Sequence, residues 1–391
     1  MASTREFDVV IFGATGFTGK LVAEYFQAQY ADNESIRWAI AGRNADKLES
    51  VKQALSISDS VASIVVDSDD DEALSNLTKR TSVVLTTVGP YQIYGEKLLA
   101  ACVENATGYT DLCGEPAWMH QMIGKYEARA KETGANIVFS CGFDSIPFDL
   151  GVYYFQQHAK AETGKTLKYV KGRVRAMKGT FSGGTAASLK ATMAAAYQDK
   201  SVLAALKNPY SLANPANTHP QPDGNTPHLD ESLNSWSAPF IMAAINTKNV
   251  HRSNHLAGYP YGEDFQYDEM LLTGPGEKGQ AMAQHVAEDK SLASDDGPKP
   301  GEGPSKEERE TGFYDVMFVG QTDDGNLLIT SVKGDKDPGY GSTSKMISES
   351  ALCLANDVNL PGGFYTPAAA FGDAIIQRLT KKAGLTFTIE R

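Results

Sequence analysis

The fold is decided near the N-terminus by the stretch Phe7-Asp-Val-Val-Ile-Phe-Gly-Ala-Thr-Gly-Phe-Thr-Gly19. Its first six residues form a short apolar run typical of a buried strand, and apolar side chains then recur at helical spacing as far as Tyr30. Three glycines between a strand and a helix allow a tight turn and a close backbone approach to a pyrophosphate, which the helix N-terminus then binds. The stretch therefore predicts a dinucleotide-binding turn made of Gly13, Thr15, Gly16, Phe17, Thr18 and Gly19.

Strand and helix signals alternate as far as about residue 150. Further strands are predicted at 37–41, 63–66, 82–88, 108–112 and 136–140, and further helices at 47–55, 71–79, 95–105 and 120–133. Such alternation is typical of βαβ units, in which helices cover both faces of a parallel sheet. The predicted class is therefore α/β, with a Rossmann-type doubly wound parallel sheet over residues 1–150.

The pattern changes after Pro147. An exposed strand is predicted at 167–180, an Ala-rich helix ends near Tyr197, irregular structure follows over 208–239, and 315–319 with 327–332 forms a hairpin. We expect a second, α+β substrate domain over 151–340, with a solvated acidic insertion near 288–310. Helices are predicted at 342–357 and 367–383, and we expect the segment 341–391 to return to the first domain.

The choice of dinucleotide is read at the end of the second predicted strand. An NAD site usually has an acidic residue there for the ribose 2′-hydroxyl, whereas this strand ends in Ala41-Gly-Arg43-Asn44 with Lys47 close behind. A guanidinium suits a 2′-phosphate, so Arg43 and Lys47 favour NADP(H), although Arg43 as a solvated surface residue stays an alternative. Asp67 is a candidate for the adenine region, or else it simply begins an acidic loop.

Catalytic candidates come from the carboxyl ends of strands, where doubly wound sheets bind their ligands. Val88, Gly89 and Pro90 follow the fourth strand and Cys141 the sixth, so these residues are assigned to the nicotinamide half of the cofactor. The absence of any Tyr with Lys four residues later excludes the usual short-chain dehydrogenase proton relay. The candidates for a proton donor are Tyr91, Tyr94 and Asp144, each with a structural alternative: a core tyrosine, or an aspartate near a helix start.

A basic strip is predicted on the strand at 167–180, where Lys171, Arg173 and Arg175 share one face. The strip is a candidate for binding an anionic group of the substrate, and a solvated strand face is the alternative. His251 and His255 lie four residues apart, but no third ligand is evident, and no metal site is predicted.

Composition excludes several classes of protein. The chain has 391 residues with 36 Lys and Arg against 48 Asp and Glu, a net charge of −12, which argues against a nucleic-acid partner. The four cysteines form no CxxC pair, and no apolar stretch is long enough to span a membrane. We expect a soluble, cytoplasmic protein that acts on a small-molecule or lipid-type substrate. Peripheral lipid contact and a homodimer are both compatible with this sequence.

Five blocks together resemble a known family: Val10–Gly19, Ala41–Arg43, Thr87–Tyr91, Tyr109–Glu115 and Ser140–Pro147. They are similar to those of the saccharopine dehydrogenase-like oxidoreductases, and most of all to the trans-acting enoyl reductases. The resemblance implies a Rossmann domain with a smaller substrate domain, and NADP(H)-dependent reduction of a C=C bond in a polyketide or lipid. Two alternatives stay open, an imine or opine reductase of the saccharopine type and a non-catalytic, NADP-binding, lipid-associated protein.

Overall fold

Strand β1 (Phe7–Phe12) is buried at every position and lies inside the first of the two seven-stranded sheets formed by the described residues. The computed structural model describes residues 5–180, 183–289, 291 and 303–391. The first sheet has the order β13-β6-β5-β4-β1-β2-β3, and every neighbouring pair in it is parallel. The predicted doubly wound Rossmann-type sheet is therefore confirmed. Its other strands are β2 (Trp38–Gly42), β3 (Ala62–Val65), β4 (Thr81–Thr86), β5 (Gly108–Thr110), β6 (Asn136–Val138) and β13 (Gly363–Tyr365).

The helices of the first 150 residues begin and end at local signals. Asn44 caps α2 by accepting the N–H of Lys47, Asp70 caps α3 by accepting the N–H of Ala73, and Gly134 ends α6 in the left-handed conformation. These caps satisfy backbone groups that the helix itself leaves unpaired. The helices are α1 (Phe17–Tyr30), α2 (Ala45–Leu55), α3 (Asp71–Arg80), α4 (Tyr91–Tyr94), α5 (Glu96–Glu104) and α6 (Pro116–Thr133).

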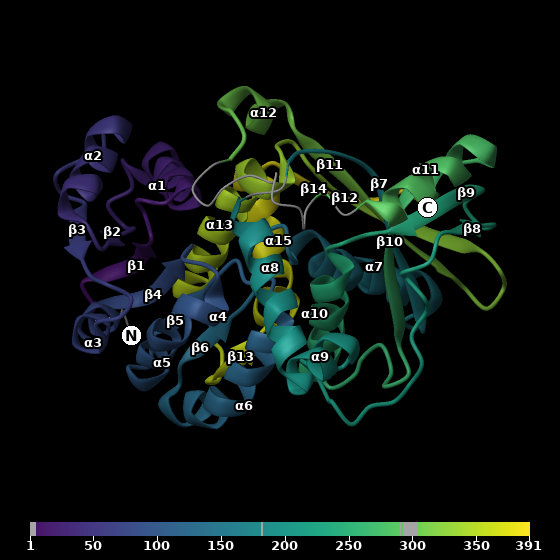
Figure 1. Ribbon diagram of the computed structural model, residues 1–391, viewed down its shortest axis with the longest axis horizontal. Helices are drawn as coiled ribbons and strands as arrows, with labels where there is room; N and C mark the ends of the chain where they lie inside the picture. The colour runs from purple at the N-terminus through teal and green to yellow at the C-terminus, as the bar shows by residue number, and fades with distance from the viewer. Residues whose placement is uncertain (1–4, 181–182, 290, 292–302) are drawn as a thin grey trace.

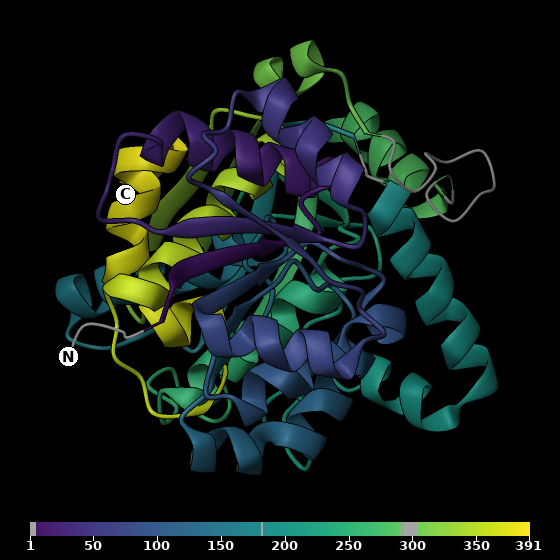
Figure 2. The same ribbon diagram turned by 90° about the vertical axis from the view of Figure 1, so that its left-hand side faces the viewer.

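The C-terminal segment lies against the first sheet. Strand β13 pairs in parallel with β6, and α13 (Thr343–Asn356) packs on α1, β1, β4 and β5. The hydroxyls of Tyr25 and Tyr30 on α1 both donate to the buried Glu349 of α13, at 2.7 and 2.6 Å. Figure 2 shows the C-terminal helices in yellow beside the purple α1. The remaining C-terminal elements are α14 (Pro367–Phe371), α15 (Asp373–Arg378), the π-helix η3 (Leu379–Ala383) and β14 (Leu385–Ile389).

The second sheet is mixed, with the order β14-β12-β11-β7-β10-β9-β8, and β7 and β10 form its one parallel pair among the described strands. Helices α7 and α10 pack on it, and Figure 1 shows it at the right of the molecule with α13 between it and the first sheet. Its strands are β7 (Tyr169–Lys178), β8 (His228–Asp230), β9 (Ser235–Pro239), β10 (Gln266–Gly274), β11 (Phe313–Gln321), β12 (Leu327–Gly334) and β14. The helices of this half are α7 (Ile146–Thr163), α8 (Gly183–Gln198), α9 (Lys200–Lys207), α10 (Ala243–Leu256), α11 (Gly276–Glu288), α12 (Lys306–Thr311) and the π-helix η2 (Pro338–Ser342).

Some expectations for the second half need correction. The stretch 208–239, expected to be irregular, contains β8 and β9, because strands of only three to five residues give little periodic signal. Residues 290 and 292–302 of the acidic insertion lie outside the described residues, whereas its end forms α12 with a capping box between Ser305 and Glu308.

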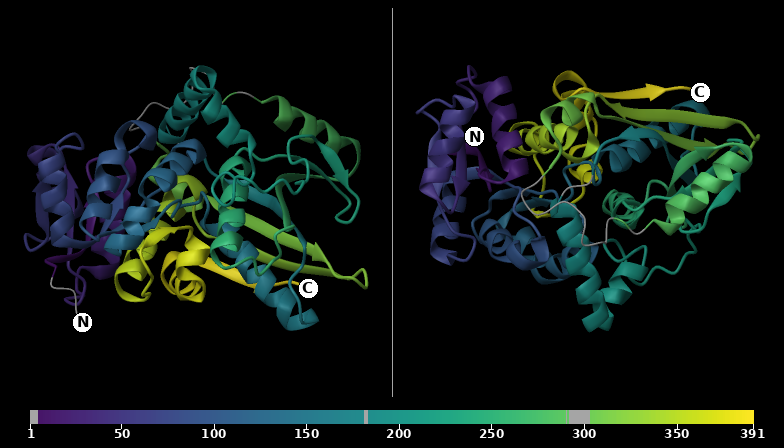
Figure 3. Two further views of the ribbon diagram at one scale, coloured as in Figure 1. Left: turned by 90° about the horizontal axis from the view of Figure 1, so that it is seen from below. Right: turned by 45° about the horizontal axis from the view of Figure 1, so that its top comes forward.

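Helices α8 and α9 form a hairpin at the edge of the molecule, where Figure 3 shows them in teal, and α9 packs on α6.

Candidate functional site

The glycine turn between β1 and α1 forms a cradle of backbone. Gly13 has a φ of +91°, and a Cβ there would lie 2.6 Å from Val88 Cγ2. A Cβ at Gly19 would lie 2.1 Å from the carbonyl oxygen of Gly13, so only glycine lets the helix pack this closely on the turn. Gly16 precedes α1 and provides no side-chain cap, which leaves the first N–H groups of the helix for a ligand. The cradle therefore fits the pyrophosphate of a dinucleotide.

A cavity of about 850 Å³ extends from this cradle along the carboxyl ends of the parallel strands and under α8. Of the residues of the predicted dinucleotide-binding turn, Gly13, Thr15, Gly16, Phe17 and Thr18 line the cavity, while Gly19 lies behind them in the packing of helix on turn. Among the described lining residues, only Arg43 and Asp144 carry a charge. The cavity thus offers one cation and one acid in otherwise neutral surroundings.

Arg43 lies at the end of β2, where the ribose of a bound dinucleotide is expected. Its side chain is exposed to the cavity and forms no hydrogen bond or ion pair with the described residues. Lys47 and Asp67 were also predicted to bind the cofactor, but neither of them lines the cavity. Lys47 is exposed on α2, and the carboxylate of Asp67 accepts the N–H of Asp69 in its own loop at 3.0 Å. Val66 and Ser68 line the cavity in place of Asp67.

The loops after β4, β5 and β6 line the next part of the cavity. Val88 and Gly89 line it, as do Gly142 and Phe143, whereas Pro90 does not. The assignment of Cys141 needs correction, because this residue is fully buried and its thiol is 3.6 Å from the carbonyl oxygen of Val138. A residue directly after a strand can point into the core or toward the ligand, and the sequence does not distinguish the two.

Tyr91 lines the cavity, but its hydroxyl is held inside the protein. The oxygen accepts the N–H of Leu112 at 3.0 Å, and the hydroxyl donates to the carbonyl of Thr86 at 3.4 Å. Burial raises the pKa of Tyr91 far above its ordinary value. The N–H groups of Tyr91 and Gln92 both donate to the buried Glu115, at 2.9 Å each. Tyr91 is therefore placed to shape the cavity wall, and its hydroxyl is a poor source of protons.

Glu115 also connects helix α8, which covers the cavity, to the segment that follows β4. Its Oε1 accepts the hydroxyl of Ser188 on α8 at 2.7 Å, in addition to the N–H of Tyr91. Gln92 donates to the hydroxyl of Thr192, one turn further along α8, at 3.2 Å. Helix α8 has few buried residues of its own, and these two contacts help to hold it over the cavity, together with its packing on α9. No sequence motif pointed to this connection, because its partners are separated by 73 and 100 residues.

Asp144 is the acid of the cavity. It follows β6 and lines the cavity beside Gly114, where a Cβ would lie 3.3 Å from its Oδ2. Burial alone raises its pKa to about 7, and no described residue donates a hydrogen bond to its carboxyl group. A carboxyl group with a pKa near neutrality can hold a proton and release it at physiological pH. Tyr94, the third catalytic candidate, also lines the cavity but is 45% exposed.

The rest of the cavity is apolar and comes from the second half of the chain. Ile241, Met242 and Ile245 lie at the start of α10, and Leu189 and Met193 lie on α8. Thr343 and Tyr340 complete the wall from the C-terminal segment, and the ring of Tyr340 packs edge-on against Phe17, with 4.6 Å between the ring centroids. These residues were not predicted, because nothing in their local sequence shows that distant segments meet at one strand edge.

The basic strip on β7 is corrected by the structure. Arg173 is fully buried, with Nη1 at 2.8 Å from Asp268 and Nη2 at 3.6 Å from Asp230. Lys171 pairs with Asp230 at 3.0 Å, and Arg175 pairs with Asp315 and Glu390 at 2.7 Å each. None of the three lines the cavity. Period-two spacing correctly places them on one face, but carboxylates from β8, β10, β11 and the C-terminus neutralise that face.

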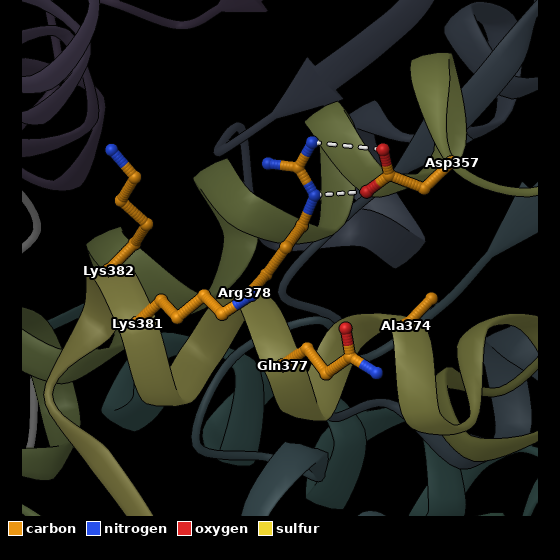
Figure 4. A pocket seen from close by; sticks show the side chains of 6 residues that line it. All are labelled: Asp357, Ala374, Gln377, Arg378, Lys381 and Lys382. Atoms are coloured by element: carbon orange, nitrogen blue, oxygen red, sulfur yellow. Dashed lines mark hydrogen bonds and ion pairs between the residues drawn. The ribbon is translucent and has the colours of Figure 1, made fainter.

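Other features of the described residues add no second site of this kind. A smaller hollow of about 310 Å³ between α13 and α15 is shown in Figure 4, where the carboxylate of Asp357 accepts hydrogen bonds from Nε and Nη2 of Arg378. No three His, Cys, Asp or Glu side chains in the described part of the chain gather as a metal site would require. Within the same residues, no helix has the length and apolar character needed to cross a membrane.

A parallel sheet with a glycine cradle, a cation at the end of β2 and a cavity along its strand ends defines a dinucleotide-binding oxidoreductase fold. The chain matches the model of the saccharopine dehydrogenase NADP-binding domain over residues 9–138. It is 38% identical to a Mycobacterium tuberculosis protein whose name places it among the trans-acting enoyl reductases, over 97% of this chain and 96% of the relative. It is 33% identical to a trans-acting enoyl reductase of Mycobacterium ulcerans, with the same shares covered.

The apo saccharopine dehydrogenase (L-Glu forming) of Saccharomyces cerevisiae has a similar fold, with a TM-score of 0.52 at 12% identity over 98% of this chain and 100% of that one. The chain therefore belongs to the saccharopine dehydrogenase-like oxidoreductases, and its full-length relatives are named enoyl reductases.

Proposed function

We propose that this protein reduces a C=C bond of a lipid-like or polyketide-like enoyl substrate with NADPH, and that Asp144 donates the proton. The observation that carries the proposal is the continuous cavity, in which a dinucleotide cradle leads past one isolated, protonatable carboxyl group to an apolar chamber. The names of the full-length relatives support the same reaction.

Arg43 supports NADPH as the reductant. A guanidinium that has no partner among the described residues, at the end of β2, can form charge-assisted hydrogen bonds to a 2′-phosphate. An acidic side chain for a free 2′-hydroxyl is absent from the described lining at this end of the cavity. The description of the matched domain as NADP-binding agrees with this choice.

The residues of this chain divide the work of the reaction. When bound, the cofactor supplies a hydride to one carbon of the double bond. Asp144 gives its proton to the other carbon or to the oxygen of the enolate that results, and is left as a carboxylate. The cradle positions the pyrophosphate, while Glu115 holds α8 over the cavity through Ser188 and so helps to exclude water.

The apolar lining favours an enoyl substrate over an amino-acid-derived imine. Substrates of the saccharopine type carry carboxylates, which need cations in the site. The described lining provides one cation, Arg43, and this residue lies at the adenosine end. The chamber itself is lined by side chains such as Leu189, Met193, Ile241 and Met242, which bind alkyl chains.

The test is a substrate panel followed through the oxidation of NADPH. Crotonyl and longer enoyl thioesters should be reduced, and longer chains should have a lower KM because they bury more apolar surface. Imines formed from 2-oxo acids and amino acids serve as the comparison set, and ketones as a second. Turnover of imines without turnover of any enoyl thioester would reject the proposal in favour of a saccharopine-type reaction. Tight NADPH binding without turnover of any set would favour a non-catalytic binding protein.

A further inference from the structure

Phe17 is the first residue of α1 and lines the cavity at the dinucleotide cradle. Because Gly16 provides no side-chain cap, the backbone N–H of Phe17 is one of the groups that a pyrophosphate can bind. The side chain of Phe17 is only half-buried, so part of its ring stays available to a ligand. What holds this ring in place therefore bears on how the cradle binds a dinucleotide.

Three residues from the second half of the chain contact the ring of Phe17. The guanidinium carbon of Arg309 on α12 lies over the ring, 5.5 Å from its centroid. The ring of Tyr340 in η2 packs edge-on against it, with 4.6 Å between the centroids and 71° between the planes. The backbone of Gly303 comes so close that a Cβ there would lie 2.6 Å from Cε1 of Phe17. Gly303, Arg309 and Tyr340 are called the ring clamp below.

The fully buried Asp337 connects two residues of the ring clamp. Its carboxylate accepts the N–H of Tyr340 at 2.9 Å and the N–H of Gly341 at 2.7 Å, which shapes the turn that carries Tyr340. The N–H of Asp337 donates to the carbonyl oxygen of Arg309 at 3.0 Å. Nη1 of Arg309 in turn donates to the carbonyl oxygen of Pro304 at 2.7 Å. Because these partners are backbone groups around one buried carboxylate, the fold itself sets the position of the clamp.

A ring that is already held in one orientation loses less conformational entropy when a ligand binds against it, so the affinity for that ligand rises. A cation over an aromatic face and an edge-on aromatic pair each favour one orientation of the ring. Arg43, at the end of β2, is proposed to bind the 2′-phosphate that only NADPH carries. The ring clamp lies at the cradle for the pyrophosphate, which NADPH and NADH share, so the clamp should affect both cofactors equally.

We propose that Arg309 and Tyr340 are positioning residues of the dinucleotide site, which raise the affinity for the cofactor by holding the ring of Phe17 at the cradle. The inference rests on the cofactor part of the proposed function. Arg309 is not among the described residues that line the cavity, so it acts through Phe17. The second half of the chain, which supplies the apolar chamber, thereby also contributes to the cofactor site.

A double-mutant cycle on cofactor binding tests the inference without any substrate. Calorimetry gives the Kd of NADPH and of NADH for the wild type, Arg309→Leu, Phe17→Ala and the double variant. Arg309→Leu should raise both Kd values by the same factor, about two- to fivefold. In the Phe17→Ala background the same substitution should have no effect, because the ring through which Arg309 acts is absent. An equal loss of affinity in both backgrounds would overturn the inference, since Arg309 would then act on the cofactor by its charge.

Further variants separate ring packing from charge. Tyr340→Phe keeps the ring and should bind both cofactors like the wild type, whereas Tyr340→Ala should raise both Kd values about two- to tenfold. Binding by Tyr340→Phe that is as weak as that by Tyr340→Ala would contradict a packing role. Lys306→Leu is the matched control for Arg309→Leu, because it removes one positive charge from the same helix at an exposed side chain that pairs with Glu310 at 3.8 Å. Its Kd values should be unchanged, and a loss equal to that of Arg309→Leu would overturn the inference.

The same measurements distinguish a failure of the clamp from a failure of the proposed function. A wild type that binds neither NADPH nor NADH would reject the cofactor and the clamp together. A wild type that binds NADPH but reduces no enoyl thioester would reject only the proposed reaction, and the double-mutant cycle would still decide whether Arg309 acts through Phe17.

Discussion

The cavity and the basic strip on β7 both contain charged side chains, but they differ in whether those charges are paired within the protein. The described lining of the cavity has two charged side chains, Arg43 and Asp144, and neither has a partner within that part of the chain. The strip has three cations, and each is matched by a carboxylate at 3.0 Å or less. A charge that is already neutralised stabilises the fold but has little attraction left for a ligand, whereas an unmatched charge at a cavity is available for binding or catalysis.

Asp144→Asn should have the largest effect on activity if the unmatched acid is the proton donor. The amide cannot donate a proton to carbon, so kcat should fall by about 10²–10⁴-fold while the Kd of NADPH stays unchanged. In the wild type the rate should fall as pH rises past about 7, because the protonated form of Asp144 is lost. The residual rate of the variant should not show this decrease with pH. Tyr94→Phe is the control: a full loss there, with activity kept in Asp144→Asn, would make Tyr94 the donor.

The same substitution should change stability with pH. Burial raises the pKa of Asp144 in the folded protein above its unfolded value near 3.9, so the folded state binds the extra proton between these values. The stabilisation from that proton is present at low pH and is lost as pH rises through about 7. Asp144→Asn should therefore melt at a higher temperature than the wild type at pH 9. Thermal unfolding of both proteins at pH 5 and 9 measures the difference, and an equal melting temperature at pH 9 would show that Asp144 is not desolvated.

Arg173→Met should have the largest effect on stability and little on the cavity. It leaves Asp230 and Asp268 without their buried partner, and breaking a buried ion pair in this way costs about 3–5 kcal/mol. Urea unfolding measures the loss, and NADPH binding by the folded protein should be retained. A variant of normal stability that binds substrate more weakly would return the strip to the role of a substrate site.

Arg43→Ala should have a smaller, selective effect on cofactor binding. Loss of charge-assisted hydrogen bonds to a 2′-phosphate costs about 1.5–3 kcal/mol, or roughly 10- to 150-fold in Kd for NADPH. The Kd of NADH should change little, which calorimetry or fluorescence titration can measure. Lys47→Ala is the matched control, because this side chain is exposed near the site but lies outside the cavity lining. Equal weakening of NADPH and NADH binding in Arg43→Ala would contradict a role in phosphate recognition.

Arg175→Gln should have the smallest effect. The guanidinium pairs with Asp315 and Glu390 where all three side chains are partly exposed, and such pairs contribute about 1 kcal/mol or less. The hydrogen bond from Arg175 lowers the pKa of Glu390 to about 2, so this stabilisation is present above pH 4 and is lost as pH falls toward 2. Urea unfolding at pH 7 and pH 3 should show a small difference between variant and wild type that shrinks at pH 3. A large loss of activity would contradict the structural role.

Much of the first sheet could be predicted because its causes are local. The buried run of β1, the glycines of the turn and the caps at Asn44 and Asp70 each act within a few residues, so the alternation of strands and helices and the cradle follow from general rules. Strand β13 could not be predicted to join this sheet, because its three residues have no periodic signal and its partner β6 lies more than 200 residues earlier.

The candidate site divides in the same way. Arg43 follows a strand that the sequence predicts, and the structure places it in the cavity lining; its contact with a 2′-phosphate stays a prediction. Cys141 also follows a predicted strand but points into the core, because the direction of the first residue after a strand depends on the backbone of the whole loop. The apolar chamber comes from α8 and α10, whose position over the strand ends is set by contacts such as Ser188 to Glu115.

The sequence by itself determined the parallel sheet, the glycine cradle and the cation at the end of β2, because short-range sterics and backbone hydrogen bonding decide these features. Only the tertiary structure decided which charges are free. Nothing in the sequence distinguishes Arg173 from Asp144 as a charge that is available to a ligand. In the structure, Arg173 is buried between two carboxylates, whereas Asp144 has no described partner. The physical reason is that a charge is neutralised or left unmatched by groups that the fold brings from distant parts of the chain.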